Sequence, residues 1–246
     1  MTAKTAPLNT YFEDMERANW PESLWYAVKD YFASHGIDMI CYQHIPPAGA
    51  ADEGKRRIYA EGYPEGLIAK YIREKKYRVD PVSNYALNAA KPFRWSEIRE
   101  LTSLSKAQVE FLEEARANGL TDGLAVQVFG PAGRNGYFGL GFGPRTAEIG
   151  DEQVREMQWV CQSAHMKYCD MVKASLPSAP HLTERELEIL AWVSRGKSNS
   201  VIADIMGIST HTVDAYLRRA FLKLGTTDRI TAAIRALGAG LISTAA

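Results

Sequence analysis

A short stretch rich in serine, alanine and proline divides this 246-residue chain into two unequal parts. The stretch runs from Ala174 to Pro180 and reads ASLPSAP, a composition that is typical of a linker and not of a helix or strand. We therefore expect two separate hydrophobic cores. The predicted organisation is an N-terminal domain at 1–174, a linker at 175–181 and a C-terminal domain at 182–246.

The composition is that of a globular protein, with 46% hydrophobic and 24% charged residues. The formal net charge is zero, which excludes a nucleic-acid coat held by bulk charge alone. From Leu182 onward, however, the chain has eight basic and six acidic residues, so this part has a small positive net charge. Cys41, Cys161 and Cys169 lack the spacing of a disulfide framework or zinc site, and the five histidines are scattered, so no metal is expected. Without a signal peptide or a membrane-length apolar run, we expect a cytoplasmic protein with no membrane partner.

Four helices are predicted after the linker. Residues Thr183–Glu186 fit a capping box that opens the first helix, and Gly196 ends it. The second helix covers about 199–206, and after a glycine turn Ser209 caps a third that reaches about Lys223. Thr226 or Thr227 is expected to cap the fourth.

The third of these helices has two different faces. Its apolar residues, at helical spacing, are Val213, Leu217, Ala220, Phe221 and Leu224. A recognition helix in a helix-turn-helix buries one such face and offers donors to phosphates and base edges on the other. A helical hairpin with a solvated charged face has the same spacing, so the spacing leaves both interpretations open. The candidate DNA contacts are Lys197, Ser209, Thr210, His211, Thr212, Asp214, Arg218 and Arg219.

Particular residue types recur along this C-terminal part: Leu182-Thr183-x-Arg185-Glu186-x-Glu188-Ile189-Leu190, Gly196-Lys197-Ser198, Ile208-Ser209, Thr212-Val213 and Gly240-Leu241-Ile242. With these residues, 182–242 resembles the LuxR-type DNA-binding domain. The resemblance implies that the third helix reads double-stranded DNA at an operator dyad and that Asp214 faces the groove. It also implies that the fourth helix pairs two subunits of a homodimer through Ile230, Ile234 and Leu237. Packing of these three side chains within one chain is the alternative.

In the N-terminal part, helix and strand signals alternate. Helical patterns cover about 10–34, where His35-Gly36 ends the run, and also 65–76, 81–90, 105–118 and 151–173. Strand patterns cover about 37–45, 55–61, 124–129 and 136–142, the last two joined as a hairpin. The predicted class is α/β: an α-β-α sandwich around an antiparallel sheet, followed by a small all-α helix-turn-helix domain.

Four motifs in this part are Tyr63-Pro64-Glu65-Gly66-Leu67-x-x-x-Tyr71, Asp80-Pro81-Val82, Pro92-Phe93-x-Trp95 and Gly119-Leu120-x-x-Gly123-Leu124. They make about 15–170 resemble the autoinducer-binding domain of LuxR-family quorum-sensing regulators. Members of that family bind acyl-homoserine lactones inside the sandwich. The resemblance implies that Asp80 accepts the ligand amide N–H, that Tyr63 and Tyr71 line the acyl side, and that Trp95 packs on the lactone ring. The candidate ligand-binding residues are Tyr63, Leu67, Tyr71, Asp80, Trp95, Ala125 and Gly139.

Each of these roles has a simpler alternative. Asp80-Pro81 is also a good N-cap followed by proline in the first helical turn. Tyr71 and Trp95 are also residues that a hydrophobic core accepts without any ligand.

Two features depart from the family pattern. Leu67 stands where the family usually has a tryptophan whose indole N–H donates to the lactone carbonyl. Leaving a buried acceptor unpaired costs about 1–3 kcal/mol, or about one to two orders of magnitude in affinity. Gly139, Gly141 and Gly143 alternate on one strand face, where the family often has a hydroxyl near Gly139. These glycines either bend the sheet or leave a wider pocket, poorer in donors, for a bulky or non-lactone ligand.

The predicted function is a transcription regulator that binds DNA under the control of a small signal, an acyl-homoserine lactone in quorum sensing, without a further cofactor. One alternative is a regulator of the same build that answers to a non-lactone ligand or to none. A signal-degrading hydrolase is more remote, because the sequence has no nucleophile motif and no clustered metal-binding motif. We therefore expect no enzymatic activity.

Overall fold

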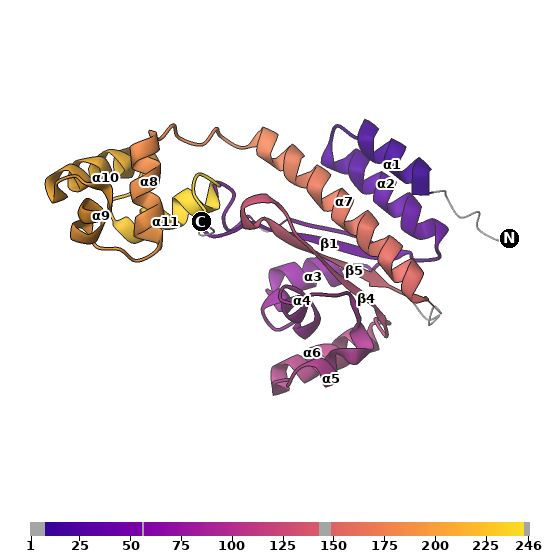
Figure 1. Ribbon diagram of the computed structural model, residues 1–246. Coiled ribbons are helices and arrows are strands. Elements are labelled where there is room, and N and C mark those ends of the chain that lie inside the picture. Colours follow the sequence, from indigo (N-terminus) through magenta and orange to yellow (C-terminus); the bar gives the residue numbers. More distant parts are fainter. Residues whose placement is uncertain (1–7, 56, 143–148, 244–246) are drawn as a thin grey trace. The chain divides into compact units, whose positions relative to one another are not determined.

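The computed structural model describes residues 8–55, 57–142 and 149–243. The chain falls into two compact units (Figure 1). The first comprises 1–45, 56–130 and 134–174, and the second comprises 46–55, 131–133 and 175–246. The sheet and its covering helices belong to the first unit, and the C-terminal helices belong to the second.

A five-stranded antiparallel sheet forms the middle of the first unit. Its strands lie in the order β2-β1-β5-β4-β3. Their bounds are β1 Met39–Ile45, β2 Arg57–Glu61, β3 Phe93–Arg94, β4 Gly123–Val128 and β5 Asn135–Gly141. Tyr42 on β1 pairs with Phe138 on β5, and their rings stack 4.6 Å apart on one face of the sheet. Because successive side chains alternate, their neighbours Cys41, Tyr137 and Gly139 lie on the opposite face.

Helices cover both faces of this sheet (Figure 1). On the Tyr42 face lie α1 Leu8–Arg17, α2 Pro21–Ser34 and the 25-residue α7 Asp151–Ser175. On the other face lie α3 Leu67–Arg73, α4 Pro81–Ala86, α5 Ile98–Leu101 and α6 Lys106–Ala117, with short 3₁₀ turns η1 Lys76–Arg78 and η2 Trp95–Glu97. A third such turn, η3 Pro131–Gly133, joins β4 to β5. The predicted α-β-α sandwich is confirmed.

Two predicted helices of this unit are interrupted. The run at 10–34 is two helices, because Pro21 has no N–H to continue a helix and Trp20 before it is extended, with φ −133° and ψ 149°. The run at 65–76 ends at Arg73, since Lys75 adopts a left-handed conformation with φ 53°. Apolar periodicity continues through both breaks, so the pattern alone did not reveal them. Among the described helices, none has the length and apolar character that a bilayer crossing requires.

The second unit contains α8 Glu184–Ser194, α9 Asn199–Met206, α10 Thr210–Leu224 and α11 Arg229–Gly238. The caps at Thr183 and Ser209 form as predicted, each hydroxyl accepting a backbone N–H from the first turn. The predicted cap of the fourth helix at Thr226 or Thr227 is wrong. Asp228 caps α11, its Oδ1 accepting the N–H groups of Ile230 at 3.0 Å and of Thr231 at 2.9 Å.

The core of this second unit confirms the apolar face of α10 and shows which side chains of α11 are buried. Buried side chains on α10 are Val213, Leu217, Ala220 and Leu224. On α11, the buried side chains are Ala232, Ala233 and Ala236. Their small size lets α11 pack closely on α8 and α10. Ile230 and Ile234 stay 69% and 39% exposed, so packing inside one chain does not account for them.

Candidate functional site

A cavity of about 200 Å³ lies in the first unit between the sheet and the layer of α3–α6. Among the candidate ligand residues, Tyr63, Leu67, Tyr71, Asp80 and Trp95 line it. Ala125 does not reach the wall and is buried behind it, in one apolar cluster with Tyr137. Residues that complete the wall and were not predicted include Cys41, Gln43, Phe111, Leu112 and Tyr137.

Asp80 is both a helix cap and a cavity residue. Its Oδ1 accepts the N–H of Val82 at 2.9 Å and of Ser83 at 3.3 Å, which caps α4. Its Oδ2 accepts the hydroxyl of Tyr71 at 2.9 Å. Burial raises the pKa of Asp80, while the hydrogen bonds from Tyr71 and Ser83 oppose that rise. The two interpretations of Asp80-Pro81 are therefore compatible, because different oxygens serve the cap and the cavity.

Trp95 lies flat on a part of the sheet that has no side chains. A Cβ added at Gly123 would lie 2.7 Å from its Cε2, one at Gly141 3.2 Å from its Cη2, and one at Gly139 3.4 Å from its Cζ2. The β5 register runs unbroken through Gly139 and Gly141, so these glycines form no bulge. They provide a platform for the indole, and Gly143 lies outside the described residues. The Nε1–H of Trp95 is buried without an acceptor in the described part of the chain.

The hydroxyls of Tyr63 and Tyr137 reach this cavity as donors. Neither has a hydrogen-bond partner within 8–55, 57–142 and 149–243. Burial raises the pKa of both tyrosines well above its usual range, so both keep their proton at neutral pH. The cavity therefore has a donor, Tyr137, that the sequence motifs did not predict. Strand alternation places Tyr137 on the same face as Gly139 and Gly141, and this was the signal in the sequence that would have revealed it.

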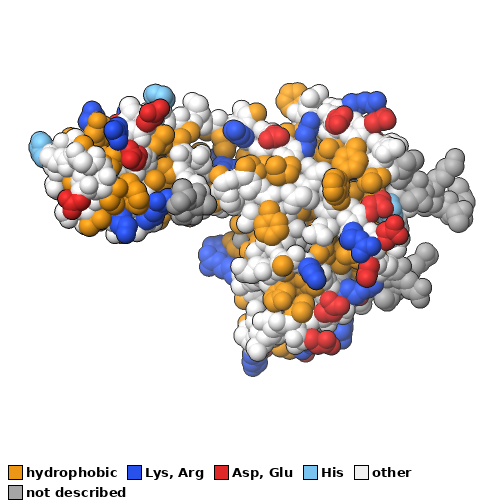
Figure 2. Space-filling model, viewed as in Figure 1, with side chains coloured by type: hydrophobic (Ala, Val, Ile, Leu, Met, Phe, Trp, Pro, Cys, Tyr) orange, Lys and Arg blue, Asp and Glu red, His pale blue; other side chains and the backbone are white. Residues whose placement is uncertain are grey.

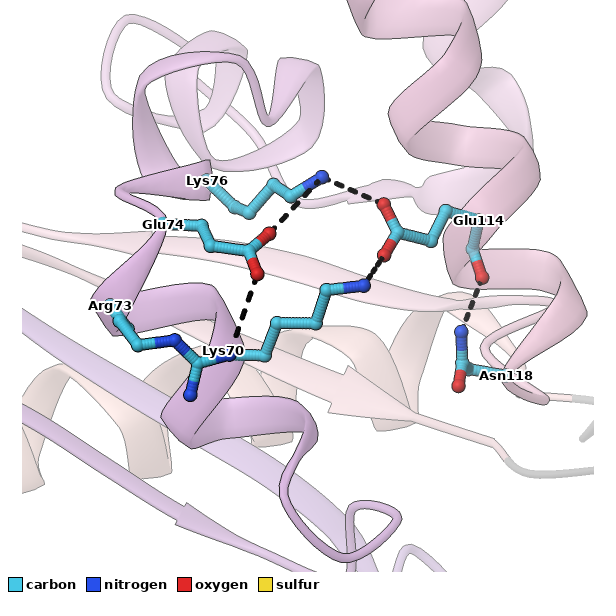
Figure 3. A network of polar contacts seen from close by, with 6 residues as sticks. All are labelled: Lys70, Arg73, Glu74, Lys76, Glu114 and Asn118. Atoms are coloured by element: carbon cyan, nitrogen blue, oxygen red, sulfur yellow. Dashed lines mark hydrogen bonds and ion pairs between the residues drawn. The ribbon is translucent and has the colours of Figure 1, made fainter.

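A cluster of ion pairs joins α3 and η1 to α6 (Figure 3), and Lys70, Lys76 and Glu114 of this cluster also line the cavity. The carboxylate of Glu114 on α6 lies 2.5 Å from Nζ of Lys70 on α3 and 2.8 Å from Nζ of Lys76 in η1. Lys76 also lies 3.8 Å from Glu74. The hydrogen bonds from both lysines lower the pKa of Glu114. These side chains are partly exposed, so the cluster adds little stability, but it links α3 to α6.

Three residues scattered in the sequence meet on the other face of the sheet. Possible ligand atoms of His44, His165 and Cys169 lie within 4.8 Å of one another, and all three residues are buried. Nε2 of His165 lies 2.8 Å from the carbonyl oxygen of Arg134, and Nδ1 lies 2.7 Å from the hydroxyl of Tyr42. Since a carbonyl only accepts, Nε2 carries the proton and Nδ1 accepts. Burial lowers the pKa of His165 to about 4, so the ring is neutral, and both its nitrogens are already engaged.

The candidate DNA-binding residues gather on α10 and at the turn before it. Thr210, His211 and Arg218 are exposed, and helical spacing places His211 and Arg218 on one face. Arg218 has no partner in the described part of the chain, which leaves its guanidinium available. Lys197, just before α9, is exposed, while its carbonyl oxygen accepts Arg229.

Other candidates on this face already have partners. Ser209 Oγ accepts the N–H of Thr212 at 3.1 Å and lies 2.8 Å from its hydroxyl. Oδ1 of Asp214 accepts a hydrogen bond from Nδ2 of Asn199 at 2.5 Å, which links α10 to the start of α9. Arg219 donates to the carbonyl oxygen of Ala215 and lies over the ring of Tyr216 at 4.5 Å. These contacts orient the helix, so Asp214 has one oxygen committed to the protein.

Basic and acidic side chains are interspersed on the visible face of each unit (Figure 2). DNA contacts on that face would therefore depend on individually placed side chains. The end of α10 is held by Lys223, whose ammonium lies 2.7 Å from the carboxylate of Glu186, itself only 2% exposed.

Comparison with known proteins agrees with both halves of this description. A model of the autoinducer binding domain matches residues 21–168, and a model of bacterial regulatory proteins of the luxR family matches 180–236. The chain belongs to the LuxR family. It is a LuxR-type transcription regulator with an autoinducer-binding domain and a helix-turn-helix domain, as the motifs predicted.

Among its relatives, the transcriptional activator AnoR of Acinetobacter nosocomialis is 30% identical over 227 residues, covering 90% of this chain and 92% of that protein. The activator LuxR of Aliivibrio fischeri is 28% identical over 188 residues, 74% of each chain. Escherichia coli SdiA has the same fold, with a TM-score of 0.75 at 22% identity over 96% of this chain and 98% of that one. SdiA solved with octanoyl-rac-glycerol gives a TM-score of 0.73 at 21% identity, covering 95% and 94%.

Proposed function

We propose that this LuxR-type regulator binds an operator dyad as a homodimer when a small acylated signal occupies the cavity of its first unit. The cavity carries the proposal, because it combines apolar walls with a buried carboxylate that has an oxygen on the wall. Small-molecule sites are typically concave and apolar, with a few placed polar groups. Ligand binding to the folded state alone stabilises that state, which links signal concentration to the amount of active protein.

In this proposal Asp80 accepts the donor next to the acyl carbonyl through Oδ2, beside the Tyr71 hydroxyl. Phe111 and Leu112 supply apolar wall for the acyl chain, and Leu67 lies beside the head group. Trp95 presents its indole to the head group from the glycine platform. These roles agree with what the family resemblance implies for Asp80 and Trp95.

An acyl-homoserine lactone is the first candidate signal, and an acyl compound without a lactone is the second. Leu67 favours the second, because its side chain offers no donor to a lactone carbonyl. Octanoyl-rac-glycerol, present in a structure of SdiA, is an example of such a compound in a protein of the same fold. Thermal unfolding with N-octanoyl-homoserine lactone or 1-octanoyl-glycerol distinguishes the two candidates by which one raises Tm more.

In this proposal the exposed face of α10 contacts the DNA bases. Arg218 is its main hydrogen-bond donor, and Lys197 contacts a phosphate of the DNA backbone. Dimerisation is assigned to the exposed face of α11, where Ile230 and Ile234 present apolar surface that a second copy would cover. We further propose that the regulator works in the cytoplasm, without a cofactor and without catalysis. Its relatives are transcription regulators, which supports a role outside catalysis.

Binding to DNA provides the direct test of this function. Fluorescence anisotropy at fixed salt would compare promoter fragments from the native host with random duplex, with and without each acyl probe. We expect a preference for one promoter that the preferred probe strengthens. Equal affinity for all duplexes in every condition contradicts the proposal, and opening of the lactone ring by the pure protein would indicate a hydrolase instead.

A further inference from the structure

Tyr137 occupies the space that a side chain at position 139 would fill. Both residues lie on β5 and face the cavity side of the sheet. A Cβ added at Gly139 would lie 2.8 Å from the hydroxyl oxygen of Tyr137 and 3.3 Å from its Cζ. Real Cβ atoms do not approach another heavy atom as closely as 2.8 Å, so a larger residue at 139 displaces the Tyr137 hydroxyl. The observed position of the Tyr137 hydroxyl therefore requires a glycine at position 139.

The Tyr137 hydroxyl is a donor without an acceptor. Tyr137 is only 5% exposed and lines the cavity, and its hydroxyl has no partner in the described part of the chain. Burial, with the carboxylate of Asp80 adding to it, raises the pKa of Tyr137, so the O–H is present at neutral pH. Buried donors are normally satisfied by a protein group, a water or a ligand. In this position the unsatisfied donor faces the ligand space.

The position of Tyr137 is also firmly held. Its strand lies between β1 and β4, where Tyr137 pairs in register with Gln43 on one side and Gln127 on the other. Tyr63, another wall residue whose hydroxyl has no partner in the described part of the chain, lies in the loop that follows β2. A donor on a central strand keeps a defined direction, which is what recognition of a single acceptor requires.

We propose that Tyr137 donates a hydrogen bond to the carbonyl oxygen of the bound signal, and that residue 139 is glycine to make room for that hydroxyl. The inference rests on the proposed function, since it assigns a specificity residue of the same cavity. Asp80 Oδ2 then accepts a donor of the same head group. The ligand class is an acyl compound whose head group presents a carbonyl acceptor and an N–H or O–H donor, as an acyl amide or an acylglycerol does.

The test measures binding of N-octanoyl-homoserine lactone and 1-octanoyl-glycerol to the full-length protein by titration calorimetry. Tyr137→Phe removes the donor and keeps the ring. We expect it to weaken the preferred probe by about tenfold, without lowering the ligand-free Tm, because the lost hydroxyl had no partner in the protein. Tyr85→Phe is the matched control, since Tyr85 packs edge-on against Phe93 outside the cavity wall.

Gly139→Ala provides a second, independent readout. Alone, it should weaken the same probe by about tenfold, because its Cβ displaces the Tyr137 hydroxyl. In the Tyr137→Phe background it should cost little more, so the two substitutions should be clearly non-additive.

Binding by Tyr137→Phe within twofold of the wild type overturns the assignment, and so do fully additive effects of the two substitutions. If the wild type binds neither probe, the acyl carbonyl is the wrong ligand group and the inference fails. The promoter preference, measured separately, then still decides whether the chain is a DNA-binding regulator.

Discussion

Replacing Asp80 by asparagine or by alanine separates its structural role from its role in binding. Asparagine retains an oxygen to accept the N–H groups of Val82 and Ser83, and it caps helices about as well as aspartate. Alanine loses that cap, which costs about 0.5–2 kcal/mol, and leaves the buried Tyr71 hydroxyl without its acceptor, for about 1–3 kcal/mol more. Asparagine, whose NH₂ group replaces Oδ2, also removes the acceptor of the Tyr71 hydroxyl, so the two variants differ by the cap. We therefore expect Asp80→Ala to lower the free energy of unfolding by about 0.5–2 kcal/mol more than Asp80→Asn does.

Ligand affinity should respond differently. In Asp80→Asn an NH₂ group replaces Oδ2 on the cavity wall, so a ligand N–H meets a donor in place of an acceptor. An unpaired donor of this kind costs about 1–3 kcal/mol, which predicts about 10- to 100-fold weaker binding of N-octanoyl-homoserine lactone. Urea unfolding of the ligand-free protein measures the first effect, and titration calorimetry measures the second. An Asp80→Asn variant that is as unstable as Asp80→Ala, or that binds the lactone like the wild type, refutes this division of the two oxygens.

The same carboxylate predicts a pH dependence. Because burial raises the pKa of Asp80 in the folded chain above its unfolded value, the folded chain holds this proton more tightly. The stability that this difference contributes is complete below the unfolded pKa and is lost as pH rises through the folded pKa. The difference in unfolding free energy between wild type and Asp80→Asn should therefore change with pH across that window. A difference that is constant with pH means that Asp80 titrates normally.

Further variants test the other assignments. Arg218→Ala should weaken promoter binding by about 1–3 kcal/mol in a gel-shift titration at fixed salt, and Arg219→Ala by less, because its guanidinium already lies over Tyr216; equal effects would contradict this ranking. Leu67→Trp should strengthen the lactone relative to 1-octanoyl-glycerol in thermal shift, and an unchanged ratio would show that position 67 does not set the choice. Ile230→Glu should raise the dimer dissociation constant in analytical ultracentrifugation with little change in Tm, since Ile230 is 69% exposed, and an unaltered dimer would assign the interface elsewhere.

What the sequence predicted correctly depended on local periodicity and on capping residues. The apolar face of α10 repeats every three to four residues, and Ser209 marks its start, so helix, boundary and buried face were all predicted. On α11 the sequence left two interpretations of Ile230, Ile234 and Leu237 open, a contact between subunits or packing within one chain. The structure buries Ala232, Ala233 and Ala236 where α11 packs against α8, and it leaves Ile230 and Ile234 exposed. Periodicity identifies apolar residues, but the size that a given helix contact accepts depends on the neighbouring helix.

Local periodicity and capping residues do not predict contacts between segments that are distant in the sequence. His44 and His165 are separated by 121 positions, and only the pairing of β1 with β5 under α7 brings them together. The cavity shows a similar limit, because the motifs identified Tyr63, Asp80 and Trp95 but not Tyr137. The glycines at 139 and 141 were interpreted either as a bend in the sheet or as a wider pocket, whereas the structure fills the space above them with the Trp95 indole and the Tyr137 hydroxyl.

The Tyr137 hydroxyl explains how a cavity wall that has no donor at Leu67 can still bind a polar head group. A tryptophan at position 67 would place its N–H on the α3 side of the cavity, whereas Tyr137 places its O–H on the sheet side. A ligand that must satisfy Tyr137 and Asp80 together is therefore anchored at the sheet, and its far end is left against the apolar side chain of Leu67. Such a cavity discriminates by the carbonyl and its neighbouring donor more than by the lactone ring. The cavity should accordingly tolerate changes in the head group better than methylation of the amide nitrogen, which removes the donor that Asp80 requires.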